Sequence, residues 1–169
     1  MGLSISKRVC RSFQTSPEFN SACDSVYEEC LKLSQDAFSG VRPYQLLAAS
    51  DRLHYSLSAM PHVHPLIAKW VPTPPTRSQV DKALREVVVV GKDTTLELGQ
   101  ADFKAFAVEV FTDAVVSNAG KAVLRRIPIG VAGIAGVGMV SRSGKDLVGT
   151  AIGVYALGVA TSIYLSLAI

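Results

Sequence analysis

Two uncharged stretches near the C-terminus decide the fold: residues 127–140 read IPIGVAGIAGVGMV, and residues 147–169 read LVGTAIGVYALGVATSIYLSLAI. As a helix, the second stretch is about 35 Å long, enough to cross a hydrocarbon core of about 30 Å. The first is about 21 Å long, which is short for a span unless flanking basic side chains reach back to the membrane surface. We therefore predict that Ile127 to Ile169 belongs in a lipid bilayer.

Two topologies fit this pattern. In a hairpin, residues 127–140 and 147–169 both cross, and residues 141–146 form the turn on the far side. In a tail anchor, only 147–169 crosses. Three basic residues within 121–126 outnumber the two in the turn. Because the more basic flank stays in the cytosol, this bias favours the hairpin.

Charge divides the chain. Of 17 basic and 14 acidic residues, only Arg142, Lys145 and Asp146 follow Arg126. Residues 12–120 hold nine basic and 13 acidic side chains, so this water-soluble part is acidic. Nucleic-acid binding is therefore not predicted, because it would require basic residues clustered on the folded body.

The first eight residues, MGLSISKR, match the M-G-x-x-x-[ST] pattern for N-myristoylation at Gly2. They resemble the N-terminus of myristoylated small GTPases of the ADP-ribosylation-factor type. No phosphate-binding loop follows, so the resemblance does not imply GTPase activity.

A single myristoyl chain holds a membrane only marginally, so we expect a second membrane signal. Two candidates lie in the same stretch. One is palmitoylation of Cys10, and the other is attraction of anionic lipids to the basic residues Lys7, Arg8 and Arg11.

We expect the body to face the cytosol of an endomembrane or the plasma membrane, because no secretory signal peptide is visible. The three cysteines form no C-x-x-C motif, which fits a reducing compartment. Cys23 and Cys30 are two helical turns apart, so we expect them to pack in a core rather than to form a disulfide.

The expected fold class is mainly α, a small helical cytosolic bundle followed by the C-terminal hairpin or tail anchor. The predicted parts are a flexible basic N-terminus (1–19), a helical pair (20–59), a Pro-rich linker (60–75), amphipathic helices (76–120), and a basic collar with membrane segments (121–169).

Apolar periodicity and capping residues place the individual helices. The predicted helices are 21–38, with Gly40 as its C-terminal cap; 43–57; 76–91, which opens with a capping box; and 101–117. A β-hairpin over 87–98 competes with the third helix, and one short turn is expected at 66–70.

The apolar stripe of the helix predicted over 101–117 must be buried, because it is unbroken. We expect it to be the inner face of the bundle, with a partner groove or the membrane surface as alternatives. The residues that carry this hypothesis are Phe103, Phe106, Val110 and Phe111.

Small residues crowd both membrane segments. In lipid, helices associate by close backbone approach over such residues, so the tail is predicted to pack against other helices, either its own, those of a second copy or those of another membrane protein. The glycines concerned are Gly130, Gly133, Gly136, Gly149 and Gly153.

Catalytic motifs are not found. The stretch Gly138–Asp146 fails the phosphate-loop pattern at two positions, and His54, His62 and His64 lack further ligands for a metal. We predict no catalytic residue, no metal and no cofactor. The hypothesis is a lipidated, membrane-anchored adaptor or accessory subunit that binds cytosolic proteins through its body; the alternative is a membrane-shaping or pore-type protein that oligomerises through its Gly-rich hairpin.

Overall fold

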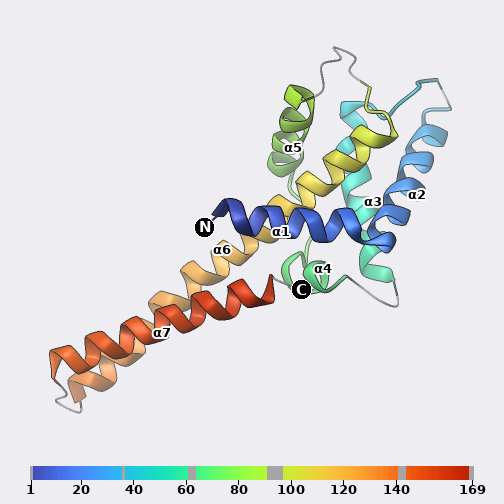
Figure 1. Cartoon of the computed structure of the whole chain (residues 1–169). Coiled ribbons are helices and arrows are strands. Elements are labelled where there is room, and N and C mark those ends of the chain that lie inside the picture. The colour runs from blue at the N-terminus through green and yellow to red at the C-terminus, as the bar shows by residue number, and fades with distance from the viewer. Residues whose placement is uncertain (1, 36, 61–63, 91–96, 141–143, 168–169) are drawn as a thin grey trace. The chain divides into compact units, whose positions relative to one another are not determined.

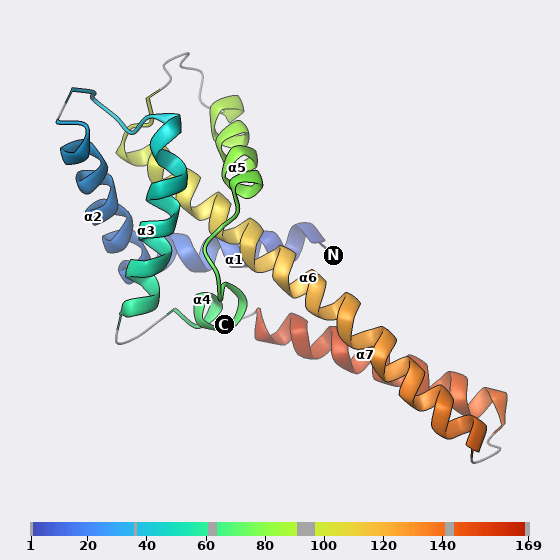
Figure 2. The same cartoon turned by 180° about the vertical axis from the view of Figure 1, so that it is seen from behind.

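The computed structural model describes residues 2–35, 37–60, 64–90, 97–140 and 144–167, and these form helices joined by loops, with one isolated β-bridge. Two compact units divide the chain, Met1–Val116 (unit 1) and Ser117–Ile169 (unit 2). The mainly helical class is thus confirmed (Figures 1 and 2). In chain order the elements are α1 (Gly2–Thr15), α2 (Pro17–Leu33), the 3₁₀ helix η1 (Pro43–Gln45), α3 (Leu46–Ala59), α4 (Pro65–Trp70), α5 (Arg77–Val90), α6 (Gln100–Val140) and α7 (Lys145–Ser166).

The core of unit 1 is aromatic and centres on the first half of α6. Phe111 lies edge-on to Phe19 of α2, with ring centroids 5.8 Å apart, and Phe13 of α1 stacks on Phe19 at 4.8 Å. Nearer the start of α6, the ring of Phe103 contacts that of Tyr27 of α2, with ring centroids 5.7 Å apart. These contacts join three helices in one apolar cluster.

Helix α2 lies beside α3 in both views (Figures 1 and 2). Helix α2 starts and ends earlier than the helix predicted over 21–38. The Ser16 hydroxyl accepts a hydrogen bond from the Phe19 amide at 3.2 Å, and Pro17 occupies the first turn. Both features fix a helix start. Ser34 caps the other end, so the predicted continuation to Phe38 is wrong.

Gly40 does not cap this helix. It precedes the isolated bridge between Val41 and Leu98, whose backbones exchange two hydrogen bonds of 2.9 Å. A Cβ at position 40 would lie 2.6 Å from the Leu98 carbonyl oxygen. Glycine is thus required here by the close approach of two loop segments.

The N-terminus differs most from expectation. Residues predicted to be flexible form helix α1, because Val9 and Phe13, four residues apart, are both completely buried. Three basic side chains remain exposed on α1: Lys7, Arg8 and Arg11. Helix α1 is therefore amphipathic, with its apolar face inside unit 1.

The remaining helices of unit 1 follow the predictions. Helix α3 continues η1, and α4 is the short turn expected in the linker. Helix α5 includes Val87 to Val90, so the competing β-hairpin is wrong for those residues. The other part of that hairpin, residues 91–96, and linker residues 61–63 lie outside the described residues.

Helix α6 runs unbroken past Ser117, where the predicted helix ended, and contains Gly120 and Pro128. One helical glycine costs about 1 kcal/mol relative to alanine, which neighbouring helical residues offset. The helix predicted over 101–117 and the segment 127–140 are therefore parts of one helix.

Candidate membrane hairpin and lipidation site

In unit 2, the second half of α6 and helix α7 lie side by side in both views and run antiparallel (Figures 1 and 2). Their register follows from two contacts. Gly130 of α6 lies against the ring of Tyr155, and Gly138 lies against Val148, where an added Cβ would approach to 2.5 Å. As the residue number rises along α6, its partner's number falls along α7, which is the signature of a helical hairpin.

Tyr155 makes the most specific contact of this hairpin. Its ring occupies the space above Gly130, and its hydroxyl donates a hydrogen bond to the Arg126 backbone carbonyl at 3.2 Å. Any side chain at position 130 would collide with the ring. Sequence reasoning missed Tyr155. The available signal was an aromatic residue with a polar tip amid small and aliphatic residues.

The hairpin presents apolar side chains outward. Both α6 and α7 are long and apolar enough, by length and composition, to cross a membrane, and most of their apolar stretches are not buried. Of the large hydrophobic residues that are exposed in the described part of the chain, eight belong to unit 2: Leu124, Ile129, Val137, Met139, Leu147, Val154, Leu157 and Leu165. Water disfavours so continuous an apolar surface.

Charged residues bracket this surface. Lys121, Arg125 and Arg126 are exposed on α6 before the apolar stretch, and Lys145 and Asp146 are exposed at the start of α7. The charge-free part of the hairpin therefore has a defined height.

The predicted packing glycines fall into two groups. Gly130 lies against α7, as does Gly138, which the site prediction omitted. Around the other four, an added Cβ would have no described atom within 4 Å apart from the chain neighbours and the backbone of the same helix, so they face open space: Gly133, Gly136, Gly149 and Gly153.

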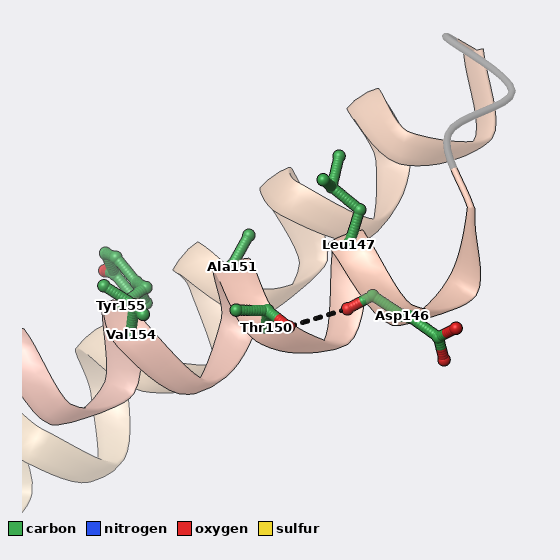
Figure 3. A pocket seen from close by; sticks show the side chains of 6 residues that line it. All are labelled: Asp146, Leu147, Thr150, Ala151, Val154 and Tyr155. Atoms are coloured by element: carbon green, nitrogen blue, oxygen red, sulfur yellow. Dashed lines mark hydrogen bonds between the residues drawn. The ribbon is translucent and has the colours of Figure 1, made fainter.

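An open groove of about 700 Å³ lies along α7. Figure 3 shows the side chains that line it. Its lining is almost entirely aliphatic and aromatic apart from its end at Asp146 and the hydroxyl of Thr150. That hydroxyl donates to the Asp146 carbonyl at 2.8 Å and is thus satisfied within its own helix. The groove is lined by Asp146, Leu147, Thr150, Ala151, Val154 and Tyr155.

At the other end of the chain, Gly2 is the first residue of α1, and Cys10 lies on the same helix. Cys10 is half-buried and lines a hollow of about 360 Å³ together with residues of α5 and α6, among them Glu86 and Glu109. Burial, and next the negative charge of Glu109, raise the pKa of the Cys10 thiol. Burial and the neighbouring Glu86 likewise raise the pKa of Glu109. The raised pKa lowers the fraction of the reactive thiolate form at Cys10.

The apolar stripe of α6 that was expected to be a core or partner face is buried. Phe103, Phe106, Val110 and Phe111 are each at most 1% exposed, all within unit 1. Cys23 and Cys30 are also buried, with free thiols.

Two of the three histidines have structural roles. The ring nitrogen Nε2 of His54 donates to the Val71 carbonyl at 2.7 Å, and His64 caps α4 by accepting from the Leu66 amide at Nδ1. His62 lies outside the described residues. Within the described ranges, no group of three or more potential metal ligands is found.

Comparisons with protein-family models, curated proteins and solved structures found no match for this chain.

Proposed function

We propose that this chain is a membrane-anchored, non-enzymatic adaptor or accessory subunit, with its hairpin in a bilayer and unit 1 at the cytosolic surface. The observation that carries this proposal is the exposed apolar surface of unit 2, which includes Leu124 at 75% and Met139 at 82% exposure. Lipid removes that surface from water, and helices satisfy all their own backbone hydrogen bonds in lipid.

The N-terminus supplies a second attachment in this proposal. A myristoyl group on Gly2 enters the membrane, and the exposed basic residues Lys7, Arg8 and Arg11 of α1 attract anionic headgroups. The apolar residues Val9 and Phe13 are already buried. Helix α1 therefore contributes charge and an acyl chain to the membrane, while its apolar face stabilises unit 1.

Adaptor function follows from what unit 1 offers to other proteins. The part of the chain between the basic N-terminus and the collar is acidic, with 13 acidic and nine basic residues over 12–120. A surface of this charge, held at a membrane, favours basic segments of cytosolic partners.

The experiment is alkaline carbonate extraction of cells that express the wild type or Gly2→Ala, with metabolic labelling by a myristate analogue. We expect Gly2→Ala to lose the label and to remain in the membrane pellet, because the hairpin suffices for anchoring. Release of either protein into the soluble fraction would contradict a membrane-inserted hairpin. Acyl-exchange labelling of wild type against Cys10→Ser tests palmitoylation, and we expect only the wild type to be labelled.

A membrane-shaping or pore-type function is the second candidate, favoured by the open faces at Gly149 and Gly153. Such faces allow close approach of another helix in lipid. A pore is the weaker form of this candidate, because the Thr150 hydroxyl is engaged by its own helix.

A further inference from the structure

The register of the hairpin fixes how much of each arm can lie in hydrocarbon. Gly130 is level with Tyr155, and Gly138 with Val148. In this antiparallel pair, each step forward along α6 matches a step of about the same length backward along α7. Both helices rise by about 1.5 Å per residue, so the same register places residues 160–166 of α7 level with residues 120–126 of α6. The last two turns of α7 are thus level with the basic residues of α6, beyond the apolar part of the hairpin.

Composition changes at the same level. Between 147 and 159, α7 carries two hydroxyl-bearing side chains, Thr150 and Tyr155. The next seven residues, 160–166, carry four: Thr161, Ser162, Tyr164 and Ser166. The more polar end of α7 is therefore level with the basic collar of α6, which is made of Lys121, Arg125 and Arg126. Both features indicate the position of the same membrane surface.

The apolar height of the hairpin follows from these two limits. The uncharged stretch of α6, residues 127–140, is about 21 Å long at 1.5 Å per residue. The part of α7 that lies opposite this stretch is residues 147–159, between Asp146 and the level of the collar, and its length is about the same. The uncharged length of 147–169 taken alone overstates the apolar height.

An average hydrocarbon core is about 30 Å thick, that of a sterol-rich plasma membrane about 32–33 Å, and that of the endoplasmic reticulum about 27 Å. Charges at both ends cannot enter hydrocarbon without penalty, although long basic side chains reach a few ångströms toward the surface. Tilting would shorten the hairpin further along the membrane normal. The mismatch is therefore smallest in the thinnest bilayers.

We propose that the hairpin is built for a thin bilayer, one of short-chain or highly unsaturated phospholipids with little sterol. This inference rests on the proposed membrane anchoring and specifies its lipid partner. It favours thin endomembranes over a sterol-rich plasma membrane.

The test is synthesis of the full chain in the presence of phosphatidylcholine vesicles whose monounsaturated acyl chains range from about 14 to about 22 carbons, a series that spans hydrocarbon thickness. The measured quantity is the fraction that floats with the vesicles after carbonate extraction. We expect it to be highest with the shortest chains and to fall about tenfold at the longest, because the cost of mismatch grows with each ångström.

The variant Arg125→Leu/Arg126→Leu extends the uncharged stretch of α6 to Ala122–Val140, about 28 Å at 1.5 Å per residue. We expect its retention in the thickest vesicles to rise about threefold or more, since the mismatch shrinks. The matched control Arg125→Lys/Arg126→Lys keeps both charges and should behave as the wild type.

Equal retention of the wild type at every thickness would overturn the thin-bilayer inference and leave the membrane anchor standing. So would a leucine variant that behaves like its lysine control. An absence of retention in all vesicles would overturn the anchor and this inference together.

Discussion

The hydroxyl of Tyr155 donates to the backbone carbonyl of Arg126 at 3.2 Å, a contact that agrees with the register given by Gly130 against Tyr155 and Gly138 against Val148. The ring reaches α6 only because residue 130 is glycine, since any Cβ there would occupy the space of the ring. Gly130 therefore leaves the space that the Tyr155 ring occupies, and α6 and α7 can approach each other closely at this point.

The variant Gly130→Leu should lower the free energy of unfolding of the hairpin by about 2 kcal/mol, because overpacking forces the helices apart. The measurement is loss of helical circular dichroism as mild detergent is replaced by a denaturing one. Gly133→Leu adds the same side chain at a position that faces open space, and should unfold like the wild type. Equal stability of the two variants would refute the seating of Tyr155 on Gly130.

Replacement of Gly149 and Gly153 together by leucine should reduce the size of the complex that the protein forms in mild detergent. The reason is that these open positions allow another helix to approach closely, and leucine prevents it. Ala151→Leu and Val154→Leu, which line the groove of Figure 3, are the matched controls. An unchanged size with insertion intact would leave the hairpin as an anchor without helical partners.

We expect His64 to make unit 1 sensitive to acid. Its Nδ1 accepts from the Leu66 amide, so the neutral ring carries its proton on Nε2, 3.3 Å from the Ser12 hydroxyl. Burial lowers the pKa of His64, a shift that Glu18 partly opposes. Because the folded pKa lies below the unfolded value, the stabilisation is complete above the unfolded pKa and is lost as pH falls through the folded pKa.

The thermal midpoint of the full chain should therefore fall as the pH drops below about 6.5, the ordinary pKa of histidine. His64→Asn keeps a side chain that caps a helix start without titrating in this range. We expect it to lose about 3 °C less than the wild type over the same pH interval. Parallel profiles for both proteins would exclude His64 as the titrating group.

Thr112 of α6 offers a gain in stability. It is 1% exposed, and its hydroxyl has no hydrogen-bond partner among the described residues. Thr112→Val keeps the shape and removes the buried hydroxyl, so unfolding should cost about 1 kcal/mol more. Ser50→Ala is the contrast, because the Ser50 hydroxyl donates to the Leu46 carbonyl at 2.8 Å and its loss should not stabilise. The measurement is chemical denaturation of the wild type and both variants. Destabilisation by Thr112→Val would contradict this prediction.

Much of the helical arrangement was predictable because its causes are local. Proline and capping residues next to apolar periodicity located α3, α4 and α5, and length and composition located α7 and the apolar second part of α6. Helix α1 was missed because its net positive charge suggested a solvated tail. Its apolar spacing, Val9 to Phe13, is short and becomes decisive only against the aromatic cluster of unit 1.

The sequence by itself determined that residues 127–140 and 147–169 are uncharged and apolar, and that charged residues lie before each of these segments, since these are properties of neighbouring residues. Only the tertiary structure decided which glycines contact the opposite helix and which face open space. Gly130 and Gly133 have similar neighbours in the chain, but only Gly130 lies against a side chain of α7. The pairing of α6 with α7 also showed that the charge-free height of the hairpin is that of its shorter arm. A contact between residues distant in the chain sets that register, and no local pattern encodes it.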